Sequence, residues 1–182
     1  MRDAFRRPAV RLHGPVEERW IDDLLAAADA AGGELMVVEV MTTGGDAEVG
    51  RRLALEVALL RERGVRPVLL GKTVVYSAGV TFMSGFKKDD RWLTGDCRML
   101  VHERQLTKTI HLDGPLAACR TQLAKAMAEI DCGELLEREG FAALADGSSL
   151  SADEVRARAE GNWYLTAAEA RDLGLIAGIF VG

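Results

Sequence analysis

The sequence contains few cysteines, and their number and spacing argue against two kinds of site. The three cysteines of the 182-residue chain are Cys97, Cys119 and Cys132. An odd number without a C-x-x-C pair predicts neither a disulfide framework nor a zinc site, and we expect no metal and no cofactor. Sparse cysteines of this kind fit a reducing compartment, so we expect a cytoplasmic protein.

Positive net charge and long apolar runs are also lacking. The formal net charge is -5, which argues against nucleic acid as a general electrostatic partner. Residues 1–8 carry charge but are not followed by the apolar stretch of a signal peptide. Glu39 or Lys72 interrupts the best apolar runs elsewhere within about ten residues, which is too short for a membrane span. We therefore expect no nucleic-acid partner, no signal peptide and no membrane association.

The composition that is present is that of a globular domain. Hydrophobic residues make up 48% and charged residues 28% of the sequence, and a chain of this length can bury a sizeable core. No repeat, low-complexity tract or linker divides the chain. We expect residues 1–182 to form a single domain.

The order of apolar patterns in the first half predicts an α/β fold. Short apolar segments typical of strands lie at 10–12, 35–41 and 65–70, and helical spacing of apolar residues is found at 16–31 and 46–63. Strands and helices that alternate in this way, with nearly continuous apolar strands, imply a parallel sheet covered by helices on both faces.

The second half continues with short elements and one long helix. We expect a short helix after residue 77, strands at 91–94 and 98–102, a long helix from about 114 to 144, and a last strand within 174–180. Gly133 and Gly140 are expected to interrupt the long helix. Two capping boxes, SADE at 151–154 and TAAE at 166–169, each predict a helix start.

Ser77 is the candidate nucleophile. A β-branched run at 72–76 breaks at this serine, and Ala78 and Gly79 follow it, which predicts a sharp turn from strand to helix. The free N–H groups and positive dipole of a helix N-terminus would stabilise an oxyanion beside a serine nucleophile. The alternative is that Ser77 only caps the helix by accepting a hydrogen bond from a backbone N–H.

Two further features belong to the same predicted edge of the sheet. Gly44-Gly45 follows one parallel strand and Ser77 the next, so the N–H groups of Gly45 and Ala78 would donate to the oxyanion if the two loops approach. His102 ends a later strand and suits the role of general base. The alternatives are two glycines that merely end a strand and a structural histidine, which is how we interpret His13 and His111.

In order along the chain, five segments resemble the proteolytic subunit of Clp protease, within the broader ClpP/crotonase fold. Residues 12–16 are similar to the family's first strand and turn, and TTGG at 42–45 is similar to its S-P-G-G oxyanion segment. VYSAG at 75–79 resembles A-A-S-M-G around the nucleophile, and MLVH at 99–102 resembles M-I-H at the base. WYLTAAEA at 163–170 with DLGLI at 172–176 resembles the family's C-terminal R-F-L-S-A-x-E-A and Y-G-L-V-D segments.

The resemblance implies a fold, an activity and an assembly. The fold would be α/β and ClpP/crotonase-like, a parallel sheet built from ββα-type repeats with a long protruding handle helix. The activity would be that of a serine peptidase acting on peptides or proteins through an acyl-enzyme, with Ser77 as nucleophile, His102 as base and Gly45 and Ala78 as oxyanion donors. Residues 103–113 would pair with extended substrate, and the long helix would stack homo-oligomeric rings.

Three departures from the family pattern are visible. Arg158 occupies the position of the triad aspartate, and an arginine cannot orient the imidazole or stabilise the imidazolium. Candidate substitutes are Glu160, Asp153 and Glu154. For the last two the structural interpretation is stronger, with Asp153 as a first-turn partner of the helix dipole and Glu154 as a capping residue. Only residues 1–9 precede the first strand, so the family's axial loop is too short or absent and an ATPase partner is not carried over. Thr43 replaces the family's proline.

Two other functions are open at the level of sequence. A noncatalytic homologue would keep the assembly surfaces without turnover. A crotonase-type enzyme acting on acyl-CoA would share the paired N–H oxyanion hole, although the pair of Ser77 and His102 and the short chain argue against it.

Overall fold

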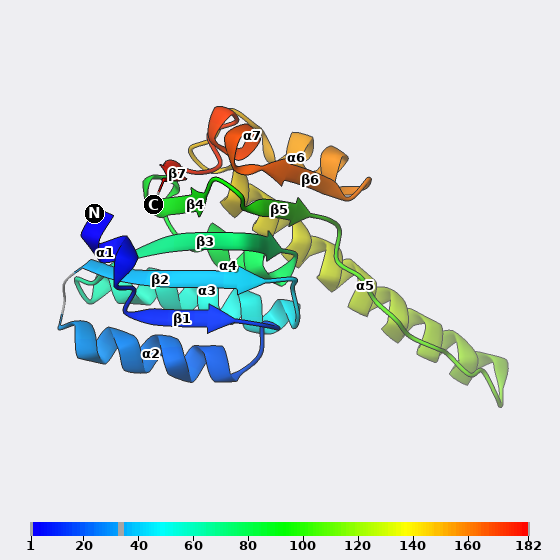
Figure 1. Cartoon of the computed structure of the whole chain (residues 1–182). Coiled ribbons are helices and arrows are strands. Elements are labelled where there is room, and N and C mark those ends of the chain that lie inside the picture. The colour runs from blue at the N-terminus through cyan, green and yellow to red at the C-terminus, as the bar shows by residue number, and fades with distance from the viewer. Residues whose placement is uncertain (1, 33–34, 182) are drawn as a thin grey trace.

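The computed structural model describes residues 2–32 and 35–181, which form an α/β fold around one sheet (Figure 1). The helices are α1 Arg2–Arg6, α2 Arg19–Ala31, α3 Ala47–Glu62, α4 Ala78–Ser84, α5 Leu116–Ala145, α6 Ala152–Ala159 and α7 Ala167–Asp172, with a short 3-10 helix at Lys88–Asp90. The strands are β1 Val10–His13, β2 Leu35–Thr42, β3 Arg66–Tyr76, β4 Arg91–Thr94, β5 Arg98–Val101, β6 Trp163–Thr166 and β7 Gly178–Phe180.

The sheet is parallel except at one strand, as the apolar patterns predicted. Its main path is β1-β2-β3-β4-β7, and β5 and β6 branch from β3. Strand β3 is long enough to serve two partners: Leu69 pairs with Arg91 of β4, and Val74 pairs with Arg98 of β5. Among the described strands, only β6 runs antiparallel, against β5. The expected strands at 65–70 and 72–76 are therefore one continuous strand that ends at the Ser77 turn.

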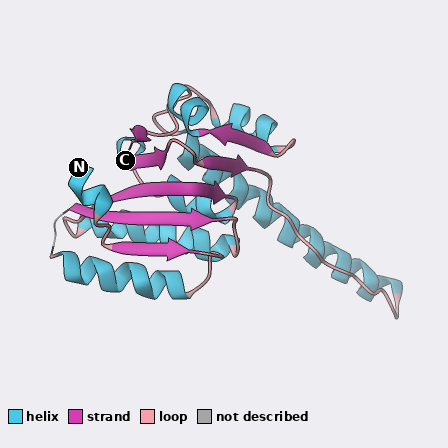
Figure 2. Ribbon diagram, in the orientation of Figure 1, coloured by secondary structure: helices cyan, strands magenta, loops and turns pink. Residues whose placement is uncertain are grey.

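The expectation that helices cover both faces of the sheet is wrong for the larger part of the fold. Helices α2, α3 and α4 contact one another and pack on β1, β2 and β3 (Figure 2). The second core cluster, on the other face, receives only α1 among the described helices, through Phe5 against Val37, Val68 and Leu70. The reason is the right-handed crossover: when each new strand is added on the same side of the last, every crossover helix falls on the same face.

The helix boundaries follow local signals. Asp46 caps α3, because its Oδ1 accepts from Glu48 N at 2.7 Å and Val49 N at 3.1 Å. Both predicted capping boxes are present, Ser151 with Glu154 and Thr166 with Glu169. The prediction that Gly133 and Gly140 interrupt the long helix is wrong, since α5 runs for 30 residues. A glycine weakens a helix but removes no backbone hydrogen bond.

Helix α5 is the long protruding helix that the sequence led us to expect. Its first half protrudes from the sheet, and the segment at 102–115 runs outward from β5 beside it, to the tip where α5 begins (Figure 1). Ion pairs and hydrogen bonds connect the two, such as Lys108 to Glu129. Residues 103–113 form no strand within the part of the chain that the structure describes. No described helix is both long enough and apolar enough to cross a membrane.

Candidate active site

Ser77 lies at a strained turn between β3 and α4. Its backbone has φ 54° and ψ -118°, a region that residues other than glycine rarely adopt. The turn is held in place because Ser77 N donates to Leu100 O at 2.9 Å and Ser77 O accepts from Val80 N at 2.8 Å. Ser77 occupies the N-cap position of α4, but its side chain makes no capping hydrogen bond, so the interpretation that its hydroxyl caps the helix is wrong. A strained residue with a free hydroxyl is typical of functional sites.

The glycine pair brings a second loop against this turn. A Cβ built on Gly44 would lie 3.0 Å from Ser77 Cβ and 3.4 Å from Ser77 Oγ, so only glycine allows this approach. A Cβ on Gly45 would lie 2.5 Å from Val16 N and Val16 O, where the loop pairs with the segment after β1. Val16 N donates to Gly44 O, and Asp46 N donates to Val16 O, both at 2.9 Å. The loop is therefore fixed on both sides.

Two backbone N–H groups are free beside Ser77. Within the described residues, neither Gly45 N nor Ala78 N donates a hydrogen bond to another backbone group. Both residues line the same cavity as Ser77, which has a volume of about 460 Å³. These are the two groups that the sequence predicted as oxyanion donors, and the fold leaves them available to a ligand.

His102 reaches the same cavity from β5. The strand pairs with β3 so that Leu100 lies beside Tyr76, and His102 follows two residues later. His102 is half-buried and lines the cavity together with Ser77. No hydrogen bond joins the Ser77 hydroxyl and the imidazole in the described part of the chain. Catalytic hydrogen bonds often form only when substrate is bound, so the arrangement is compatible with a nucleophile and its base.

A backbone carbonyl occupies the position on His102 where a triad has its acid. His102 Nδ1 lies 2.5 Å from Glu103 O. A carbonyl oxygen can only accept a hydrogen bond, so in the neutral imidazole Nδ1 carries the proton and Nε2 keeps its lone pair. This is the tautomer that a general base needs.

The candidate acids from the sequence lie elsewhere. Asp153 on α6 and Glu160 at its end are exposed and do not line the cavity. The hydrogen bonds from Ser151 lower the pKa of Glu154 and account for that residue as a capping group. Arg158 lies over the ring of Trp163, 5.0 Å from its centroid. The structure thus brings Ser77, His102, Gly45 and Ala78 together, without Asp153 or Glu160.

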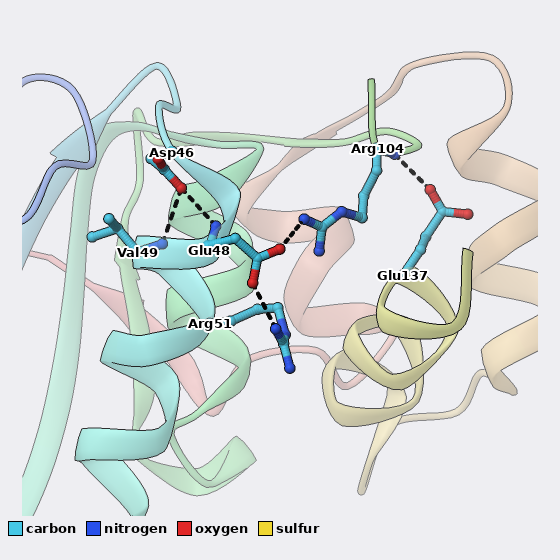
Figure 3. Close-up of polar contacts among 6 residues, drawn as sticks. All are labelled: Asp46, Glu48, Val49, Arg51, Arg104 and Glu137. Atoms are coloured by element: carbon cyan, nitrogen blue, oxygen red, sulfur yellow. Dashed lines mark hydrogen bonds and ion pairs between the residues drawn. The ribbon is translucent and has the colours of Figure 1, made fainter. Parts of the chain in front are cut away.

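Four charged residues that the sequence did not identify form a polar network beside this site (Figure 3): Arg51, Arg104 and Glu137 line the cavity, and Glu48 contacts both arginines. Glu48 on α3 accepts hydrogen bonds from Arg51, at 2.6 Å, and from the Arg104 side chain. Glu137 on α5 accepts from the backbone N–H of Arg104 at 2.5 Å. Burial raises the pKa of Glu48, but the hydrogen bonds from Arg104 and Arg51 outweigh it and hold the pKa below its ordinary value.

Only part of this network has a sequence signal. Glu48 and Arg51 are three residues apart on one helix, a spacing that favours an ion pair. The contacts to Arg104 and Glu137 join residues 56 and 33 positions apart. No local pattern announces such contacts, so they depend on the fold.

A second cavity of about 580 Å³ continues along residues 103–106. It shares Glu103, Arg104 and Glu137 with the first cavity. The two cavities adjoin along these shared residues, and we call them together the groove; its lining includes Ser77, residues 103–106 and residues of α5 between 129 and 144.

Comparison with known proteins supports the fold. No protein-family model and no curated protein sequence matches the chain. Among solved structures, the chain is similar to a mutant of ClpP1 from Listeria monocytogenes, with a TM-score of 0.72 over 95% of this chain and 91% of that chain. The sequence identity is 17%, which supports a common fold and no more. The ClpP-like fold predicted from the ordered motifs is therefore confirmed.

Proposed function

We propose that this chain is a serine peptidase of the Clp proteolytic-subunit type, with Ser77 as nucleophile and His102 as general base. The observation that carries the proposal is a single cavity that holds a strained serine, a histidine with a free Nε2 and two free N–H groups. Each of these groups meets one requirement of acyl transfer. Together they come from three segments that are distant in the sequence: Gly45, Ser77 with Ala78, and His102.

The chemistry follows from these positions. Ser77 Oγ attacks the carbonyl carbon of a peptide bond, and His102 Nε2 takes the hydroxyl proton. The N–H groups of Gly45 and Ala78 donate to the resulting oxyanion. The C–N bond then breaks, the imidazolium gives its proton to the leaving amine, and an ester to Ser77 is left. Water, deprotonated by the same imidazole, hydrolyses this ester and regenerates the serine.

The groove supports a peptide or protein substrate. Residues 103–113 have few backbone partners within the described chain, so their N–H and C=O groups are available to pair with an extended peptide. The resemblance also supports a ring-shaped homo-oligomer, and the cysteine usage supports a cytoplasmic location.

A fluorophosphonate probe tests the nucleophile directly. The wild-type chain should gain one adduct by intact-mass analysis, and Ser77→Ala should gain none. His102→Ala should label about 100-fold more slowly or worse, the usual loss when a general base is removed. Cleavage of a fluorogenic peptide should disappear with Ser77→Ala. The proposal fails if the wild type takes no label under conditions that label a known serine hydrolase.

One observation favours a second candidate, a noncatalytic assembly subunit. In the described residues the Ser77 hydroxyl has no hydrogen bond to the imidazole, and no carboxylate contacts His102 Nδ1. Such a subunit would form the same oligomer as the proposed peptidase. It would neither react with the fluorophosphonate probe nor cleave the peptide. Peptide cleavage that Ser77→Ala abolishes, with the oligomer unchanged by mass photometry, would reject it.

A further inference from the structure

The peptide unit between Glu103 and Arg104 is hydrogen-bonded on both of its edges. Its C=O accepts from His102 Nδ1 at 2.5 Å, and its N–H donates to Glu137 Oε2 at 2.5 Å. We propose that Glu137 is a positioning residue for His102, acting through this single peptide unit. The inference rests on the proposed role of His102 as base.

The geometry of a peptide unit makes the two bonds interdependent. The unit is planar, and in the trans form its C=O and N–H point in opposite directions. Glu137 on one side and His102 on the other therefore fix the same rigid plane. Rotation of that plane would break both bonds at once. The orientation of the imidazole thus depends on a carboxylate that does not touch it.

The two hydrogen bonds also polarise the peptide unit in the direction that favours a proton on His102 Nδ1. A carboxylate that accepts from an N–H draws charge through the amide and makes its carbonyl oxygen a better acceptor, since hydrogen bonds in a chain strengthen one another. A stronger acceptor at Glu103 O favours the proton on His102 Nδ1 and leaves Nε2 free. This is the orienting role that a triad carboxylate performs by direct contact, in a chain where Arg158 occupies the expected acid position.

The neighbouring charges keep Glu137 available for this role. The side chain of Arg104, whose backbone N–H Glu137 accepts from, is paired with Glu48, which also accepts from Arg51 (Figure 3). Within the described parts of the chain, Glu137 takes part in no ion pair. The carboxylate of Glu137 is therefore left to accept from the backbone N–H of Arg104. The side chain of Arg104 connects the same segment to α3 through Glu48.

Two variants at Glu137 separate charge from hydrogen bonding, and Glu139→Gln is the matched control. Glu137→Ala removes the acceptor, whereas Glu137→Gln keeps an acceptor oxygen without the charge. Glu139 lies two residues away on α5, is exposed and lines neither cavity. Its substitution removes the same charge from the same helix.

The first readout is the tautomer of His102, measured by ¹⁵N NMR of protein labelled at histidine and assigned with His102→Gln. Wild type and Glu139→Gln should show the proton on Nδ1. Glu137→Ala should move the population toward the Nε2-protonated form, and Glu137→Gln should lie between them. A merely structural role for Glu137 would leave the tautomer unchanged.

The second readout is the rate of fluorophosphonate labelling. Glu137→Ala should lower it at least about 10-fold, the scale on which outer partners of functional histidines act. Glu137→Gln should lose less, and Glu139→Gln nothing. Circular dichroism checks the fold, and if Glu137→Ala is unfolded, Glu137→Gln alone decides both readouts.

The outcomes distinguish this inference from the proposed function. An unchanged tautomer and rate in both Glu137 variants overturn the positioning role, whatever the wild type does. A wild type that takes no label overturns the catalytic proposal, and the tautomer measurement then still decides whether Glu137 orients His102.

Discussion

At the scale of single residues, a buried cation ties together the elements that form the cavity. Arg91 on β4 is 2% exposed. Its guanidinium donates to five backbone carbonyls, at the end of α4 (Ser84, Phe86), at the end of α5 (Ala143, Leu144) and at Leu175. Burial lowers the pKa of Arg91 to about 10, so the side chain stays charged at neutral pH. The end of the protruding helix is thereby fixed to the sheet.

We predict that Arg91→Met strongly destabilises the fold. Methionine fills a similar length but leaves five buried carbonyls without donors, and each unsatisfied group costs about 1–3 kcal/mol. Urea unfolding should show a loss of more than about 3 kcal/mol. Arg63→Met is the control, because Arg63 forms an exposed pair with Asp29 and should lose at most about 1 kcal/mol. Similar losses in the two variants would contradict the role assigned to Arg91.

The residues of the candidate site divide by the kind of signal they leave in the sequence. Ser77, Gly45 and His102 end predicted strands, and the rule that parallel strands place their carboxyl ends at one edge brings them together. Glu137 gives no such signal, since it is one of several glutamates on a long helix. Its partner is a backbone N–H, which every residue of a loop possesses. Only the fold selects that glutamate and that peptide.

At the scale of secondary-structure elements, a buried carboxylate links three neighbouring strands. Glu39 on β2 is 4% exposed. It bonds to His13 on β1 at 2.9 Å and to Lys72 on β3 at 2.6 Å. Burial raises the pKa of Glu39, but the hydrogen bonds and charges of Lys72 and His13 outweigh it, so the pKa lies below its ordinary value of 4.5.

This arrangement predicts that the sheet loses stability in acid through Glu39. A carboxyl whose pKa is depressed by folding stabilises the protein above its unfolded pKa, and the contribution is lost as the pH falls through the folded pKa. Glu39→Gln should therefore be less stable than wild type near neutral pH, and the difference should shrink below about pH 4.5. Urea unfolding across this range measures it.

Asp172→Asn serves as the control for the acid experiment. Asp172 is paired with Arg171 at an exposed position, so its substitution should leave the pH dependence of wild type nearly unchanged. A gap between Glu39→Gln and wild type that stays constant from about pH 7 to about pH 3 would contradict the assignment.

The elements themselves were largely predictable, and the failures have physical causes. Periodicity and caps place the helices and strands, because those signals are local. The face that each helix covers is set by crossover handedness and strand order, which no local pattern contains. Gly133 and Gly140 misled the prediction of α5, since the cost of about 1 kcal/mol for a glycine is small beside 30 residues of helix.

At the scale of the whole molecule, one helix connects the candidate site with a group of exposed apolar side chains. Leu136, Glu137 and Phe141 on the inner half of α5 line the first cavity. On its outer half Leu123 and Met127 are exposed by 45% and 56%. Apolar side chains that gather on a protruding element mark an interaction surface. Whatever covers the outer half therefore acts on the same rigid helix that carries Glu137.

The last prediction is that copies of this chain associate through the outer half of α5. Wild type should form an oligomer at micromolar concentration by light scattering after gel filtration. The double variant Leu123→Glu with Met127→Glu should dissociate it, because burying two charges without partners is costly. Gln122→Glu, which adds a charge on the same helix without removing an apolar side chain, should keep most of the oligomer. Both variants should retain the wild-type far-UV circular dichroism, since residues 123 and 127 are exposed in the single chain. A wild type that is monomeric, or an oligomer that survives the double variant, would show that α5 is not the interface.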